Sequence, residues 1–311
     1  MVGYIYGPKI LNKTRIVTIK IWRRALLLYG LAVGFTLFYT AWAALLSADY
    51  ARQPNWSGGF IDLLVQSATL QFHFGWADFL ARYAVFMVFA PLAVWLVAKH
   101  RGWIVVVVST LVWLLWREIP GWQIFTAWQI VFMFGIIIGY YLPAIEKYVR
   151  GWKPSLRNTL WWFVVGLASL SYVAVVVRFS ILPFFIPSID DSMPTSIDRL
   201  FDRESVGLLR ILTGILWFSG LFLLFRRFED TVDRWTFGTL LLLGKNSLFV
   251  YSAEALVIFT IDVVFPAPAS SSILLNTFVG IVGMTIVYFA TRYKQFLNPS
   301  RYTSKNEATR V

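Results

Sequence analysis

Ionisable side chains stand inside apolar segments of this 311-residue chain, where each costs about 3 kcal/mol or more in hydrocarbon. Segment 237–263 contains four small or polar residues at helical spacing, which are Gly244, Ser247, Tyr251 and Glu254. On a continuous helix they form one polar stripe. The stripe predicts the lining of an internal cavity, with Glu254 as acid, base or substrate anchor. A helix–helix contact, with Glu254 paired to an arginine from another segment, explains the pattern equally well.

A second group of ionisable residues marks the start of another apolar segment. Asp78 and Arg82 lie four residues apart, so they share one helical face and are predicted to pair. The pair belongs either to a catalytic site or to the membrane interface, where it would hold the helix end in place. His73 lies shortly before it, and a group that titrates near neutral pH is a catalytic candidate. Interfacial packing of His73 is the other interpretation.

Two further pairs have both a functional and a structural explanation. Arg23 and Arg24 adjoin the first apolar segment. They supply positive charge that orients the chain, or they clamp the phosphates of a cytoplasmic donor, because guanidinium groups match phosphate geometry. Trp128 and Gln129 stand inside an apolar segment, where a buried amide needs hydrogen-bond partners. These partners come from helix packing or from a ligand.

Several kinds of chemistry are excluded or have no sequence support. The chain has no cysteine, which excludes disulfides, thiolate metal ligands and a cysteine nucleophile. No spacing of metal ligands, no phosphate-binding loop and no Ser/His/Asp order appears, so no metal is predicted. His100, the second of two histidines, is expected to be solvated in the turn Lys99–Arg101.

The elements that position these residues are predicted to be membrane helices. Hydrophobic residues make up 58% of the chain and charged residues 14%, where a soluble domain carries about a quarter. Lipid accepts such apolar surface. We therefore predict an all-α polytopic membrane protein of about eight transmembrane helices. Their segments are 25–47, 79–98, 103–116, 124–142, 159–178, 207–225, 237–263 and 273–291. The third is short for a crossing.

The distribution of positive charge predicts the orientation of the chain. Twenty of the 28 Lys and Arg residues fall in alternate connecting segments and the ends, against four in the opposite segments. This asymmetry places both ends in the cytoplasm and the chain in the inner membrane. The charges are divided among five segments, which argues against nucleic acid and favours membrane lipid as a partner. One domain over 1–297 and a polar tail over 298–311 are expected, with Gly135 and Gly139 as a close-packing motif.

Five segments stand out by their order and spacing. They are residues 3–7 (GYIYG), 21–30 (IWRRALLLYG), 77–102, 126–139 (TAWQIVFMFGIIIG) and 242–254 (LLGKNSLFVYSAE). Together they resemble the OpgC family of integral-membrane acyltransferases. The resemblance implies about ten helices and an acyltransferase that moves an acyl group, such as succinyl, from cytoplasmic acyl-CoA to a periplasmic glucan or other carbohydrate. Acyl-CoA is then a co-substrate, and no bound cofactor is expected.

The resemblance also implies roles for individual residues. Arg23 and Arg24 match the arginine pair on the family's donor side. Asp78 and Tyr83 match its D-x-L-x-x-Y segment, with Arg82 between them, and Trp128 and Gln129 match its W-Q pair. By position, the candidate catalytic residues are Glu254, Asp78 and His73. The lining of the substrate site is assigned to Arg82, Tyr83, Trp128, Gln129, Ser247 and Tyr251.

One departure from the family bears on activity. The family opens with a helix that bears an Asp/Arg motif and a histidine expected to be the general base, followed by a second helix with an SGY-type turn. Here Val2–Tyr4 stand where that second helix would finish. The chain is therefore expected to lack two helices and that histidine, and to be inactive if nothing replaces it. A small-solute transporter and a non-catalytic membrane partner are the alternatives.

Overall fold

The protein is all-helical throughout the part that the computed structural model describes. That part comprises residues 2–45, 59–74, 78–116, 119, 122–177, 201–202, 205–264 and 273–297, and it contains no strand. The predicted fold class is confirmed. The predicted polar tail lies outside the described residues, as do residues 46–58 and 178–200.

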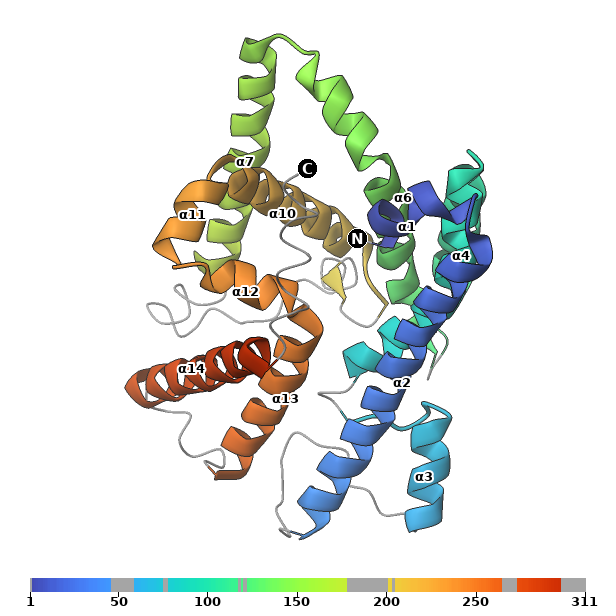
Figure 1. Cartoon of the computed structure of the whole chain (residues 1–311), viewed down its shortest axis with the longest axis vertical. Coiled ribbons are helices and arrows are strands. Elements are labelled where there is room, and N and C mark those ends of the chain that lie inside the picture. The colour runs from blue at the N-terminus through green and yellow to red at the C-terminus, as the bar shows by residue number, and fades with distance from the viewer. Residues whose placement is uncertain are drawn as a thin grey trace, which may run out of the picture. The chain divides into compact units, whose positions relative to one another are not determined.

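Twelve helices are described, and each of the eight predicted segments overlaps at least one of them (Figure 1). Their bounds are α1 (Val2–Ile10), α2 (Thr14–Leu45), α3 (Phe60–Ala68), α4 (Asp78–Ala98), α5 (Gly102–Trp116), α6 (Gln123–Arg150), α7 (Pro154–Val176), α10 (Leu208–Arg227), α11 (Glu229–Trp235), α12 (Thr239–Lys245), α13 (Ser247–Val264) and α14 (Ile273–Leu297). Six of them, α2, α4, α6, α7, α10 and α14, are long and apolar enough to cross a membrane. The chain is a multi-pass membrane protein.

Two of the eight predicted crossings differ from a simple span. Helix α5 has only 15 residues and rises about 22 Å, as the short third segment implies. The seventh segment, predicted as one continuous helix, is instead two helices, α12 and α13, bent by 96°. Counting the bent pair as one span gives up to seven crossings, so eight crossings and the cytoplasmic location of both ends stay predictions.

Asn246 explains the break between α12 and α13. Its buried side-chain amide donates a hydrogen bond to the carbonyl of Leu242 at 3.0 Å, and its backbone N–H contacts the carbonyls of Leu242 and Leu243. Asparagine forms such local side-chain-to-backbone bonds readily and is a weak helix former. Here the bonds close the end of α12, and α13 begins at Ser247.

The chain divides into two compact units, each described here by itself. Unit 1 comprises Met1–Gly34, Val65–His73 and Asp78–Arg227, and unit 2 comprises Phe35–Leu64, Phe74–Ala77 and Phe228–Val311. Helix α2 contributes to both units. In unit 1, α4 is the most deeply buried helix and packs against α1, α5 and α6, while α7 packs against α10.

Two glycines of α1 let it lie directly against α6. A Cβ atom on Gly3 would collide with the carbonyl oxygen of Ile136, and one on Gly7 would collide with the ring of Tyr140. These residues form a GxxxG pattern whose missing side chains permit close helix approach. Of the motif predicted on α6, Gly139 is buried, but Gly135 is exposed and faces open space. The close contact therefore uses α1 glycines that the sequence analysis did not identify.

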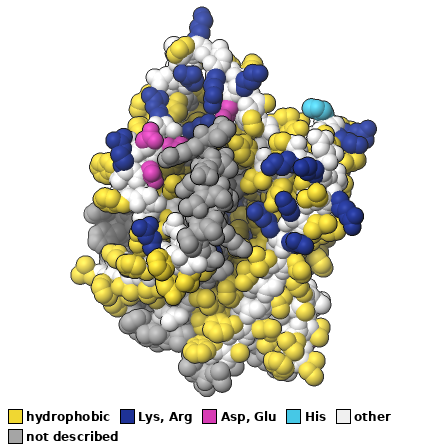
Figure 2. Space-filling model, in the orientation of Figure 1, with side chains coloured by type: hydrophobic (Ala, Val, Ile, Leu, Met, Phe, Trp, Pro, Cys, Tyr) yellow, Lys and Arg dark blue, Asp and Glu magenta, His cyan; other side chains and the backbone are white. Residues whose placement is uncertain are grey.

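Apolar side chains cover the outside of the helices as well as the interior. Figure 2 shows hydrophobic side chains over much of the face drawn, and large ones such as Leu26, Phe89 and Leu170 are more than half exposed. Water would reject such a surface and lipid accepts it. In unit 2, a buried aromatic cluster of Tyr39, Phe74 and Phe259 provides the interior contact.

Candidate functional site

The predicted ion pair between Asp78 and Arg82 is present in unit 1 at the start of α4. The Arg82 guanidinium bonds the Asp78 carboxylate, and its Nε donates to the Asp78 backbone carbonyl at 3.3 Å. Arg82 also lies over the ring of Trp128 from α6, with 5.2 Å between its Cζ atom and the ring centroid. The Arg82 side chain is 11% exposed, so it is held by a carboxylate and an aromatic face in a largely dry place.

His73 is brought to this pair by a strained turn. Helix α3 ends in a turn in which Gln71 N–H donates to the carbonyl of Gln66 at 2.9 Å and Leu70 adopts a φ of 57°. This left-handed conformation favours glycine, so a leucine here stores strain of the kind found near functional sites. The turn carries the chain back so that His73 interacts electrostatically with both Asp78 and Arg82.

The surroundings of His73 lower the pKa of its imidazole below the usual value. Burial is the largest cause and Arg82 adds to it, while Asp78 and a backbone hydrogen bond with Leu70 act in the opposite direction. Its Nδ1 atom is buried and has no hydrogen-bond partner among the described residues. A buried nitrogen without a hydrogen bond costs free energy, so the Nδ1 atom of His73 is a candidate to bond a ligand hydroxyl. A neutral imidazole can accept a proton there.

Arg24 joins the same region of unit 1 through two tyrosines. Its Cζ atom lies 5.7 Å from the ring centroid of Tyr6 on α1, and its guanidinium interacts electrostatically with Tyr83, the residue after Arg82. Arg23 and Arg24 are both exposed, and neither forms an ion pair with any described residue. Tyr6 was missed by the sequence analysis, although it lies in the GYIYG segment used for the resemblance.

Arg24 lies farther along its helix than the sequence suggested. The predicted first span begins at residue 25, whereas α2 begins at Thr14, so Arg24 is about 15 Å from the helix start. Trp22 Nε1 donates to the carbonyl of Val88 at 3.1 Å, which aligns this part of α2 with the middle of α4. The arginine proposed for the donor side and the tyrosine proposed for the substrate side therefore lie close together.

Gln129 has a structural partner within the bundle. The Ser109 hydroxyl on α5 donates to its Oε1 at 2.7 Å, and its Nε2 donates to the Ser109 carbonyl at 2.8 Å. Both ends of the amide are thus used to join α5 and α6. This bonding favours the packing explanation of Gln129 over the ligand explanation.

The remaining predicted residues, Ser247, Tyr251 and Glu254, lie on α13 in unit 2. The stripe that included Gly244 is interrupted, because the 96° bend at Asn246 separates α12 from α13. The continuous-helix geometry used for that stripe is wrong for this reason. Glu254 is exposed and forms no ion pair with a described residue, so the predicted arginine partner is not found in the described ranges.

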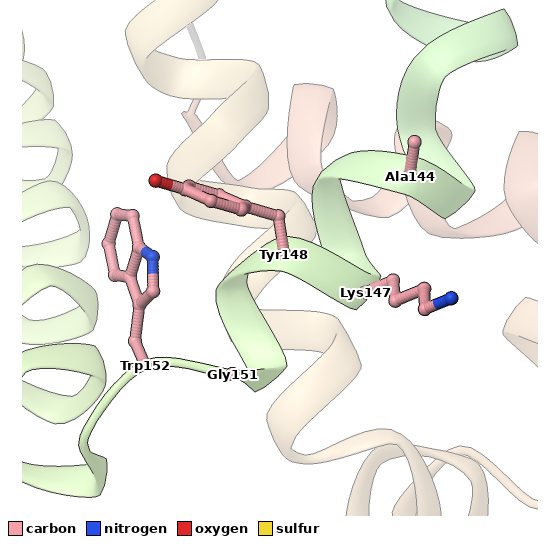
Figure 3. A pocket seen from close by; sticks show the side chains of 5 residues that line it. All are labelled: Ala144, Lys147, Tyr148, Gly151 and Trp152. Carbon is pink, nitrogen blue, oxygen red and sulfur yellow. The ribbon is translucent and has the colours of Figure 1, made fainter.

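A separate hollow lies where α6 turns into α7. It has a volume of about 520 Å³ and is lined by Ala144, Lys147, Tyr148, Gly151 and Trp152. Figure 3 shows the rings of Tyr148 and Trp152 on one side of the end of α6 and Lys147 extending from the other. The two rings meet edge to face with centroids 5.7 Å apart. None of the predicted site residues lines this hollow.

No group of three or more His, Asp or Glu side chains in the described ranges is arranged to hold a metal ion. The candidate site in unit 1 is built from an imidazole, an ion pair, an arginine and tyrosines. Whether these residues act in catalysis stays a prediction.

Comparison with known proteins identifies the family. No curated protein and no solved structure matches the chain. The family described as OpgC protein matches residues 1–298, which include every predicted site residue and end where the polar tail was predicted to begin. A match over nearly the whole chain shows that this multi-pass membrane protein belongs to the OpgC protein family.

Proposed function

We propose that the chain is an OpgC-like acyltransferase of the inner membrane. It transfers a succinyl-type acyl group from cytoplasmic acyl-CoA to a periplasmic glucan or another extracytoplasmic carbohydrate. Membership of the OpgC family supports the general class. The observation that carries the proposal is the buried Nδ1 of His73, which has no described partner and lies beside the Asp78–Arg82 ion pair.

In this scheme His73 acts as the general base. A hydroxyl of the acceptor binds at the imidazole and gives up its proton as its oxygen attacks the thioester carbonyl carbon. The carbon–sulfur bond then breaks, the acyl group stays on the acceptor oxygen as an ester, and the proton passes from His73 to the departing CoA sulfur. A neutral imidazole is required at the start, which agrees with the lowered pKa of His73.

The ion pair and the arginine have supporting roles. Asp78 stabilises the imidazolium that forms when His73 takes the proton, while Trp128 and Asp78 keep Arg82 in one position. Arg24 and Tyr83 interact electrostatically. Both side chains can donate hydrogen bonds to negative charge on acyl-CoA or on the reacting carbonyl oxygen. Preorganised donors of this kind typically contribute about 100-fold or more to acyl transfer.

The test uses the full chain in proteoliposomes, with labelled succinyl-CoA on one side and a glucan acceptor on the other. The wild-type protein is expected to place label on the glucan. His73→Gln is expected to lower the rate by about 100-fold or more. His100→Gln is the matched control, because His100 is exposed in the α4–α5 turn. The absence of label with wild-type protein, or full activity of His73→Gln, contradicts the proposal.

Glu254 and the transporter alternative are tested in the same system. Transporter sites often use helices broken in corresponding halves of the chain, and α12–α13 is the single bent pair within the described ranges. Uptake of a solute without acyl transfer would favour a transporter with Glu254 at its site. Unchanged phenotypes for Glu254→Gln, Arg23→Gln and Arg24→Gln would favour the non-catalytic membrane partner.

A further inference from the structure

The N-terminal helix α1 carries an aromatic ring to a cation of α2. Tyr6 is 7% exposed, and its ring faces the Arg24 guanidinium at 5.7 Å. A cation over an aromatic face at this distance is attracted by the electrons of the ring, and more strongly where the pair is shielded from water. The contact joins two helices separated by the turn at 11–13.

The position of that ring is determined by close packing of its own helix. Gly3 and Gly7 flank Tyr6 in sequence, and side chains at either position would collide with α6 at Ile136 and Tyr140. Helix α1 also packs against α4, which carries Tyr83. The ring of Tyr6 is therefore buried on a helix that is closely packed against α6 and α4.

Arg24 itself has a charge that no described side chain neutralises. It forms no ion pair with a described residue, and it interacts electrostatically with Tyr83. An arginine side chain has many rotamers, so its immobilisation by a ligand costs conformational entropy. A ring that limits its rotamers before a ligand arrives reduces that cost at the binding step.

We propose that Tyr6 is a positioning residue that holds the Arg24 guanidinium beside Tyr83, ready to bind a phosphate or thioester oxygen of acyl-CoA. The ligand named here rests on the proposed function. The three residues lie on α1, α2 and α4 of unit 1, and their positions come from the structure alone. The aromatic face, and not the Tyr6 hydroxyl, is the part that acts.

The experiment measures the dissociation constant of CoA for the purified full-length protein in lipid nanodiscs. Tyr6→Leu is expected to weaken binding about fivefold, because the ring is lost. Tyr6→Phe keeps the ring and is expected to bind within twofold of wild type. Tyr4→Leu is the matched control, since Tyr4 lies on the same helix but is exposed.

A variant pair separates positioning from damage to the fold. On an Arg24→Gln background, Tyr6→Leu is expected to have no further effect on CoA binding, because Tyr6 acts through Arg24. The inference is overturned if Tyr6→Leu weakens CoA binding further on that background. It is also overturned if Tyr6→Leu binds CoA as tightly as wild type, or if Tyr6→Phe and Tyr6→Leu weaken binding equally. Wild-type protein that binds no CoA overturns it as well.

Acyl transfer is measured separately so that the two proposals fail independently. If CoA binding depends on Tyr6 but no acyl group is transferred to any glucan, this inference is supported and the acyltransferase proposal is contradicted. If the wild-type protein transfers the acyl group and Tyr6→Leu has the same KM for succinyl-CoA, the acyltransferase proposal is supported and the role of Tyr6 is contradicted.

Discussion

Trp22 and Val88 align α2 with α4, through a hydrogen bond of 3.1 Å from the indole Nε1 to the backbone carbonyl. Val88 lies midway along α4, three residues before Pro91. Pro91 has no backbone N–H, so α4 lacks one backbone hydrogen-bond donor at that position. This alignment places the neighbouring Arg24 close to Tyr83. Residues assigned to the donor and acceptor sides of the reaction therefore belong to one region of unit 1.

Replacing Trp22 by Phe tests this alignment. The ring is largely retained and the hydrogen bond is lost, so we expect a decrease in unfolding free energy of about 1 kcal/mol. Thermal unfolding in detergent measures the change. Trp103→Phe is the control, because Trp103 is exposed on α5. A larger loss for Trp103→Phe would contradict the assigned role.

Arg24 and Arg23 are adjacent, and Arg24 lies 5.7 Å from the Tyr6 ring centroid and interacts electrostatically with Tyr83. We expect Arg24→Gln to lower kcat/KM for acyl transfer about tenfold or more, because the guanidinium that would donate hydrogen bonds to negative charge on acyl-CoA or on the reacting carbonyl oxygen is lost. Arg23→Gln is expected to have a smaller effect. Transfer rates over a range of succinyl-CoA concentrations measure both variants. A larger effect at Arg23 would show that charge near the helix start matters more than the contacts of Arg24.

The pH dependence of stability reports on His73. Burial lowers its pKa in the folded protein, so the unfolded chain binds more protons as the pH falls. The stabilising contribution of the neutral imidazole is complete above its ordinary value of about 6.5 and is lost as the pH falls toward the lowered value. We expect wild-type protein to lose more stability than His73→Gln between about pH 7 and pH 5. Chemical unfolding at each pH measures the difference.

His100 provides the comparison for that titration. It is exposed, so His100→Gln is expected to follow the wild-type pH dependence. Parallel curves for wild type and His73→Gln would contradict the assignment of a buried, neutral imidazole.

Glycine substitutions distinguish the observed helix contact from the one that the sequence suggested. Gly3→Ala places a methyl group against the carbonyl of Ile136, so we expect a loss of about 1–3 kcal/mol. Gly135→Ala faces open space and is expected to be neutral or to stabilise α6 by up to about 1 kcal/mol. Thermal unfolding of the two variants in the same detergent measures the contrast. Equal losses would contradict the packing of α1 on α6.

Sequence alone determined the kind of protein and the pairings that lie within one helix. Long apolar runs require helices in lipid, because every backbone group must be bonded internally, and each of the eight predicted segments overlaps at least one described helix. The spacing of four residues between Asp78 and Arg82 sufficed to predict their ion pair. Local periodicity contains this information.

Only the tertiary structure decided which helices bring their side chains together. The contacts of Arg24 with Tyr6 and Tyr83 depend on packing among α1, α2 and α4, which no spacing along the chain encodes. The bend at Asn246 was missed because the apolar pattern continues across it, while one side chain closes the end of α12. Hydrophobic periodicity reports burial along one helix, whereas close approach and helix ends depend on a few specific contacts.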